Sequence, residues 1–189
     1  MAFALAVAIV GIFALVTGGK IQNIKNIQFR YSWLVFVAVI IKIITNSDLR
    51  FILAIPDWLA PKLYIISLIL VAVFVLFNIY LRGLVLVGLG LVSNLTAIFF
   101  NSGYMPVKSE YFNIIASAEE LERINQGLTA FNYLPTGPST KFYYLSDIFL
   151  MPHWVFMTKV FSIGDVLITI GGAIFVWTSI RTTQVKKAV

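Results

Sequence analysis

The sequence has no cysteine and a single histidine, and each shortage excludes a kind of chemistry. Without cysteine the chain forms no disulfide, Cys-ligated zinc site, iron–sulfur cluster or cysteine nucleophile. His153 alone does not make a histidine-rich metal site, and a position at a membrane interface is the favoured alternative for it. We therefore expect no metal and no cofactor. Any chemistry must come from carboxylates, hydroxyls or amides.

Charged residues are also scarce, whereas apolar residues are abundant. Only 12% of the 189 residues are charged and 60% are hydrophobic, while soluble domains average about 25% charged and about 45–50% apolar residues. This composition excludes a water-soluble globular domain, a disordered chain and a collagen-like chain. It indicates a single integral membrane domain over residues 1–189, with the lipid bilayer as its partner.

The apolar residues gather in five runs that predict membrane-spanning helices, each of which needs about 20 residues. The predicted spans cover approximately residues 2–17, 31–45, 63–81, 84–100 and 161–180. A long polar segment, 101–159, separates the last two. We therefore predict an all-α bundle of about five transmembrane helices. Glycines inside two of these helices, among them Gly83, Gly90 and Gly171, predict close helix packing.

The basic residues divide unequally between the two sides that five spans define. One side receives seven basic residues and no acidic one: Lys20, Lys25, Arg30, Arg82, Arg181, Lys186 and Lys187. The other side, which includes Lys42, carries seven basic and seven acidic residues, and Asp165 completes the net charge of +6. Because positively charged short loops stay in the cytoplasm, we predict an outer N-terminus and a cytoplasmic C-terminus in a bacterial inner membrane. The basic excess then reports topology, and no nucleic-acid partner is expected.

Two aspartates stand where a membrane protein has few ionised groups. Asp165 lies about one turn inside the last predicted helix, on the outer side, where a carboxylate needs a raised pKa, a partner or water. The alternative is that Asp165 caps or tethers the start of that helix. Asp147 lies eighteen residues earlier in a partly apolar stretch, and its alternative role is an ordinary helix N-cap after Ser146.

If the two carboxyls meet at the outer face, we expect them to share a proton, because adjacent like charges do not both ionise. One would then act as general base on water while the protonated one polarises a carbonyl. Asn94 and Asn101 are seven residues apart, on one helix face. They would either orient a carboxylate or a bound peptide carbonyl, or form hydrogen bonds between helices, and Asn78 is expected to do the latter.

Three segments resemble an uncharacterised bacterial membrane-protein family, a domain of unknown function. They are Asn101–Val107, Leu145–Ile148 and Phe161–Ile168. This resemblance extends over most of the chain and implies no activity.

The last third is also similar to lipoprotein signal peptidase (signal peptidase II). The segments Leu145–Phe149 and Phe161–Asp165 resemble the two aspartate motifs of that family, and Asn101-Ser102-Gly103 resembles its Asn-x-Gly motif. The resemblance implies that Asp147 and Asp165 form the catalytic dyad of an aspartic-type intramembrane peptidase.

Two functions from different classes follow. The first is an aspartic peptidase-like hydrolase that acts on a membrane-anchored peptide or a lipid-linked substrate at the outer leaflet, with Asp147 and Asp165 catalytic and Asn94 and Asn101 orienting. The alternative is a non-enzymatic accessory subunit or small transporter, in which Asp165 tethers the long outer segment or relays protons.

Overall fold

The computed structural model of the chain describes residues 2–45, 47, 49–116, 118, 121–122, 132–152, 155 and 160–182. It is mostly helical, and its long helices are α1 (Ala2–Val16), α2 (Trp33–Thr45), α4 (Ala60–Phe77), α5 (Leu84–Phe100) and α8 (Ile163–Arg181). Each of them occupies one of the five predicted apolar runs, so the prediction of helices at those places is confirmed. His153, Lys186 and Lys187 lie outside the described residues.

Two of these helices, α4 and α8, are long and apolar enough to cross a membrane. The other three are shorter apolar helices. The 18 residues of α4 rise about 27 Å, close to the roughly 30 Å thickness of a hydrocarbon core. Only 17% of the apolar window in α4 and 22% of that in α8 is buried inside the protein. Most of their apolar surface therefore faces outward.

Helix α4 begins three residues earlier and ends four residues earlier than the predicted span. Pro61 fits into its first turn, where a helix does not need the N–H that proline lacks. Asn78 ends the helix because its fully buried side chain serves another segment, donating from Nδ2 to the Arg30 carbonyl oxygen over 2.9 Å. Asn78 therefore joins the end of α4 to the connection before α2, and the predicted hydrogen bond between two helices is not what its side chain forms.

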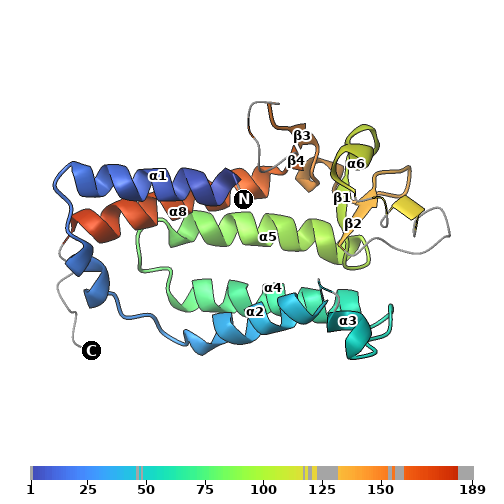
Figure 1. The fold of residues 1–189 in the computed structure, drawn as a ribbon, viewed down its shortest axis with the longest axis horizontal. Coiled ribbons are helices and arrows are strands. Elements are labelled where there is room, and N and C mark those ends of the chain that lie inside the picture. Colours follow the sequence, from blue (N-terminus) through green and yellow to red (C-terminus); the bar gives the residue numbers. More distant parts are fainter. Residues whose placement is uncertain are drawn as a thin grey trace.

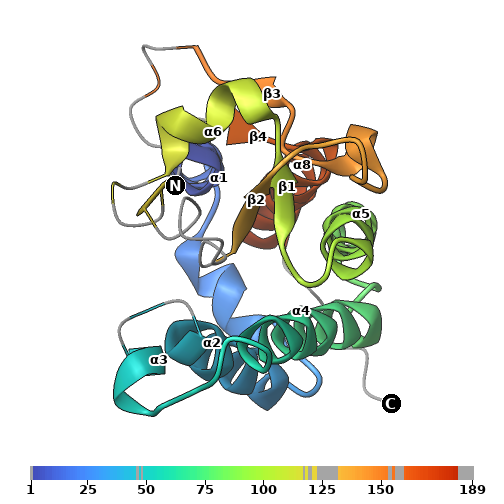
Figure 2. The same ribbon diagram turned by 90° about the vertical axis from the view of Figure 1, so that its right-hand side faces the viewer.

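The long helices form two layers, with α1, α8 and α5 in one and α2 and α4 in the other (Figures 1 and 2). Helix α8 packs between α1 and α5, and α4 connects the layers by packing on α2 and α5. Helices α1 and α8 run parallel, because Gly172 approaches Val7 and Gly11 approaches Val176 one turn further along both helices.

Short elements between α5 and α8 form a cap at one end of the helices (Figure 1). The described cap, within residues 101–162, contains β1 (Met105–Val107), α6 (Ser109–Ile115), β2 (Tyr133–Pro135), η2 (Tyr143–Leu145), β3 (Phe149–Leu150) and β4 (Val160–Phe161). Strands β1 and β2 pair in parallel, and β3 and β4 pair antiparallel. The all-α prediction is therefore too simple. Strands of two or three residues have no detectable period of two, so the pattern did not predict them.

Two further short helices lie in connections between the long ones. The 3-10 helix η1 (Ile21–Asn26) follows α1, and α3 (Leu49–Ile52) follows α2. The backbone N–H of Lys20 and the Asn23 side chain both donate to the Ile180 carbonyl oxygen, at 3.0 and 2.7 Å. These bonds hold the segment that carries η1 against the last turn of α8.

Candidate functional site

Helices α5 and α8 cross closely, and this crossing positions the candidate site. Gly83 lies opposite Gly171, and Gly90 lies opposite Gly164, so the helices are antiparallel with matching seven-residue spacings. A Cβ atom on Gly171 would lie 2.6 Å from the Gly83 carbonyl oxygen. The backbones therefore meet because these positions have no side chains. The prediction of close packing from these glycines is confirmed.

This crossing predicts different effects for two adjacent glycines of α8. We expect Gly171→Ala to destabilise the protein by about 1–3 kcal/mol, because its new methyl group would push against backbone atoms of α5. Gly172→Ala is the control, since its nearest neighbour would be a Val7 methyl at 3.4 Å, an ordinary contact. Thermal unfolding in a neutral detergent measures both variants. Equal stability losses would contradict the proposed backbone contact.

Asp165 lies in the first turn of α8 and is held by a capping box. The Asp165 N–H donates to Ser162 Oγ over 3.2 Å, and the Ser162 N–H donates to Asp165 Oδ2 over 3.0 Å. These reciprocal bonds satisfy two backbone donors that the helix start leaves without partners. The alternative in which Asp165 caps the helix is therefore confirmed.

Asn94 on α5 joins the capping box of α8 to the neighbouring helix. Its Nδ2 donates to Asp165 Oδ1 over 2.9 Å, and its Oδ1 accepts a hydrogen bond from Ser162 Oγ over 2.9 Å. Both oxygens of the Asp165 carboxylate thus have donors. Asn94 therefore forms the predicted hydrogen bond between helices, and the same bond orients the Asp165 carboxylate.

Asp147 lies in the cap, two residues after the end of η2, and hydrogen bonds of its backbone hold it against β1. Its N–H donates to the Pro106 carbonyl oxygen over 2.9 Å, and its carbonyl oxygen accepts from the Lys108 N–H over 3.1 Å. These bonds form a parallel bridge between Asp147 and Val107 in β1. The alternative in which Asp147 is a helix N-cap is therefore wrong, because the chain continues as extended backbone beside β1.

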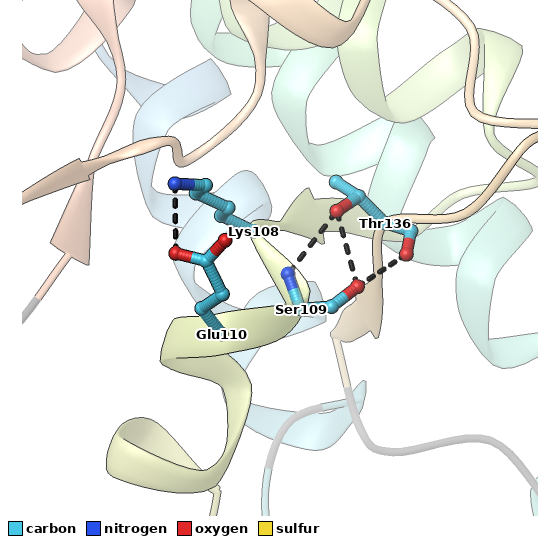
Figure 3. Close-up of polar contacts among 4 residues, drawn as sticks. All are labelled: Lys108, Ser109, Glu110 and Thr136. Atoms are coloured by element: carbon cyan, nitrogen blue, oxygen red, sulfur yellow. Dashed lines mark hydrogen bonds and ion pairs between the residues drawn. The ribbon is translucent and has the colours of Figure 1, made fainter.

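Further hydrogen bonds fasten the end of β1 to the segment after β2 (Figure 3). The Ser109 N–H donates to Thr136 Oγ1 over 3.1 Å, and Ser109 Oγ donates to the Thr136 carbonyl oxygen. The Lys108 ammonium forms an ion pair with Glu110 over 2.8 Å. The backbone N–H of Lys108 thus holds Asp147, while the ammonium group of Lys108 pairs with Glu110.

The Asp147 side chain is buried in the cap. It is 6% exposed, and its Oδ1 has no hydrogen-bond partner within the described part of the chain. Its bridge partner Val107 packs with Phe112 and Val160, while the nearby Leu145 packs against Met105. Burial raises the pKa of the Asp147 carboxyl from 3.8 to about 7, and the negative charge of Asp165 adds to this rise. Asp147 therefore holds a proton up to about neutral pH.

The structure brings some predicted site residues together and separates others. Asp165 acts on Asp147 electrostatically, but no hydrogen bond joins their carboxyls in the part of the chain that the structure describes. Asn101, at the end of α5, bonds elsewhere. It donates to the Lys141 carbonyl oxygen over 2.8 Å and accepts from the Lys141 N–H over 3.0 Å. Asn101 thus fixes the cap to α5, and the hydrogen bond to Asp165 comes from Asn94.

Sequence reasoning missed two residues that matter here. Ser162 completes the capping box, and its position three residues before Asp165 was the available signal. Arg50 on α3 is only 2% exposed and forms an ion pair with Asp57. The sequence signal for this ion pair was two opposite charges that stand seven positions apart in a largely apolar connection.

These features define a mostly helical protein with two helices able to cross a membrane and an aspartate buried within the cap at one end of the helices. The model of a family of unknown function, DUF5317, matches residues 26–177, and the chain belongs to this family. The resemblance to a family of unknown function is thereby confirmed. No curated protein and no solved structure matches the chain.

Proposed function

We propose that the chain is a multi-pass protein of a bacterial cytoplasmic membrane, with five spans, an outer N-terminus and a cytoplasmic C-terminus. The apolar faces of α4 and α8 support insertion, because a core helix of a soluble protein would be mostly buried. The parallel course of α1 and α8, with α5 antiparallel to α8, agrees with spans that alternate in direction. In this topology the cap lies on the outer side.

Within that membrane protein, we propose a non-enzymatic role in which the cap responds to protons through Asp147. The observation that carries this proposal is the burial of Asp147, with Oδ1 unpartnered among the described residues and Asp165 within electrostatic reach. Asp165 itself is the tether, since Asn94 and Ser162 occupy both of its oxygens. Loss of the Asp147 proton places a second negative charge in a buried site near Asp165. That charge weakens the bridge between Asp147 and β1.

Hydrogen exchange tests this role directly. As the pH rises from 5.5 to 8, we expect the amides of Lys108 and Asp147 to lose protection relative to those of α5, because their mutual bridge loosens. Referring each rate to α5 removes the general acceleration of exchange by base. In Asp147→Asn the relative protection should stay constant with pH. An unchanged ratio in the wild-type protein would contradict the proposal.

The second candidate is the aspartic hydrolase, and the different surroundings of the two carboxyls favour it. Asp165 is oriented by two donors, whereas Asp147 keeps its proton to about neutral pH. In this reaction Asp165 removes a proton from a water that attacks a peptide or lipid-linked carbonyl. Asp147 gives its proton to the carbonyl oxygen. As the tetrahedral intermediate collapses, Asp165 gives the proton taken from water to the cleaved nitrogen or oxygen, and Asp147 recovers its proton from a hydroxyl of the intermediate.

Asparagine variants distinguish the two candidates. If the chain is a hydrolase, Asp147→Asn and Asp165→Asn each abolish release of a membrane-anchored peptide product, while expression and insertion remain at wild-type levels. Glu110→Gln is the matched control, because this cap carboxylate has a 70% exposed side chain and pairs with Lys108. Unchanged product release in both aspartate variants would exclude the hydrolase.

A further inference from the structure

A cavity of about 460 Å³ lies at the opposite end of α4 from the aspartates and is lined by Arg30, Tyr31 and Phe77. Arg30 and Tyr31 belong to the connection between η1 and α2, and Phe77 is the last residue of α4. The 18 residues of α4 place this cavity about 27 Å along the helix from the cap. It is therefore separate from the site of Asp147 and Asp165.

The backbone that presents Arg30 is held on both sides by one buried side chain. The Arg30 N–H donates to Asn78 Oδ1 over 2.9 Å, and Asn78 Nδ2 donates to the Arg30 carbonyl oxygen over 2.9 Å. The Tyr80 hydroxyl adds a hydrogen bond to the Gln28 carbonyl oxygen over 2.6 Å. Because these bonds fix the chain before a ligand arrives, little backbone order is lost on binding.

Tyr31 occupies an uncommon backbone conformation at the wall of the cavity. Its φ of 55° lies in the left-handed region, which bulky residues rarely adopt. Its ring packs on Phe77, with 4.6 Å between ring centroids. Backbone outliers of this kind concentrate at binding and switch sites, because the surrounding structure must hold them.

The charge around the cavity favours an anion. The Arg30 guanidinium lies 5.4 Å from the centre of the Tyr80 ring, and within the described residues it forms no ion pair with a carboxylate. Further positive charge lies in the chain segments at this end of the helices, since Lys20 and Lys25 precede Arg30 in the same connection and Arg181 ends α8. A guanidinium presents donors in a planar fork that matches two phosphate oxygens.

We propose that this cavity binds the phosphodiester headgroup of an anionic phospholipid of the cytoplasmic leaflet. This inference rests on the proposed membrane topology, which places the cavity at that leaflet, and not on the role of Asp147. Exposed apolar side chains on the adjoining helix ends favour a lipid over a free phosphate, since Trp33 begins α2 with 58% exposure and Leu76, next to Phe77 in α4, is 64% exposed. These groups offer a surface for acyl chains next to the headgroup.

Lipid titration of the full chain in a neutral detergent tests the site. Binding of phosphatidylglycerol is measured by native mass spectrometry, with phosphatidylcholine, whose phosphate is balanced by a choline cation, as the comparison without net charge. We expect Arg30→Gln to weaken phosphatidylglycerol binding about tenfold, as expected for one lost charge-assisted contact. Arg82→Gln is the control, because it removes an equal charge from the same side and should change the affinity less than twofold.

Two further measurements separate the possible outcomes. Arg30→Lys keeps the charge but not the planar fork, so its affinity should lie between those of the wild-type protein and Arg30→Gln. Inorganic phosphate should leave the melting temperature unchanged, whereas phosphatidylglycerol should raise it. Wild-type lipid affinity in both Arg30 variants, or equal stabilisation by inorganic phosphate, would overturn the proposal. Asp147→Asn should bind phosphatidylglycerol normally, so failure of the proton-linked cap remains distinguishable.

Discussion

Asp147→Asn should stabilise the protein at pH 8 and leave its stability at pH 4 nearly unchanged. Near pH 4 the carboxyl is protonated in the folded protein and close to its ordinary pKa of 3.8 in the unfolded chain. Between about pH 4 and pH 7 the unfolded chain releases this proton first, because the folded pKa is about 7. The unfolded state therefore binds fewer protons, and folding stability falls as the pH rises through this window. Above pH 7 the loss is complete.

The expected size of this effect is on the order of 2–4 kcal/mol, since each pKa unit corresponds to about 1.4 kcal/mol. Asparagine has nearly the shape of aspartate but never ionises, so the variant should lose this component of the pH dependence. Unfolding in neutral detergent at pH 4, 6 and 8 gives the difference between variant and wild type. Glu110→Gln is the control, because it removes another carboxylate of the same cap, on a side chain that is 70% exposed. Parallel curves for wild type and Asp147→Asn would contradict the assignment.

Asp165→Asn should destabilise the folded protein, in contrast to Asp147→Asn, and should lower its free energy of unfolding by about 2 kcal/mol at neutral pH. An amide has one oxygen, whereas the Asp165 carboxylate accepts from both Asn94 Nδ2 and the Ser162 N–H. The substituted NH₂ group must therefore face one of these donors, and a charge-assisted hydrogen bond is lost. Thermal unfolding in detergent gives the loss. Thr178→Val is the control, since its hydroxyl bonds only to carbonyl oxygens of its own helix.

A double-mutant cycle with Asn94→Ala separates the contact between helices from the helix cap. We expect a coupling energy of about 1–2 kcal/mol between Asn94 and Asp165, because their side chains share one hydrogen bond in a half-buried site. Ser162→Ala should cost about 1 kcal/mol through loss of the cap. Additive effects of the Asn94 and Asp165 substitutions would show that Asp165 acts only on its own helix.

Local patterns carried most of what could be predicted. Helix α5 begins and ends where expected, at Leu84 and Phe100, because Gly83 with φ 90° and the turn at Asn101 bound an uninterrupted apolar run. The capping role of Asp165 was among the predicted alternatives, because an acidic residue in the first turn of a helix is favoured by the helix dipole. Such features depend on residues within one helical turn of each other, so they can be predicted from the sequence alone.

The remaining features depend on contacts between distant parts of the chain. Asp147 is buried where it pairs with Val107 of β1, forty positions earlier, and nothing near Asp147 in the sequence indicates this pairing. Asn94 reaches Asp165 across 71 positions through the glycine crossing of α5 and α8. The glycines predicted a close approach of helices, but the matching register that selects this asparagine follows only from the folded arrangement.

The burial of Asp147 thus gives this protein one carboxyl with an unusual affinity for protons, next to a second carboxyl whose two oxygens are hydrogen-bonded. In the accessory role this affinity sets the pH at which the cap loosens, and in a hydrolase it supplies the acid. Both roles require the same protonation state of Asp147 below neutral pH. They differ in whether a substrate reaches the pair.

Infrared difference spectroscopy of the reconstituted protein tests that protonation state most directly. The C=O band of a protonated carboxyl should disappear with a midpoint near pH 7 in the wild-type protein. The same transition should be missing in Asp147→Asn and retained in Glu110→Gln. A carboxyl at Asp147 that titrates near pH 4, as an exposed aspartate does, would contradict this account of the buried site.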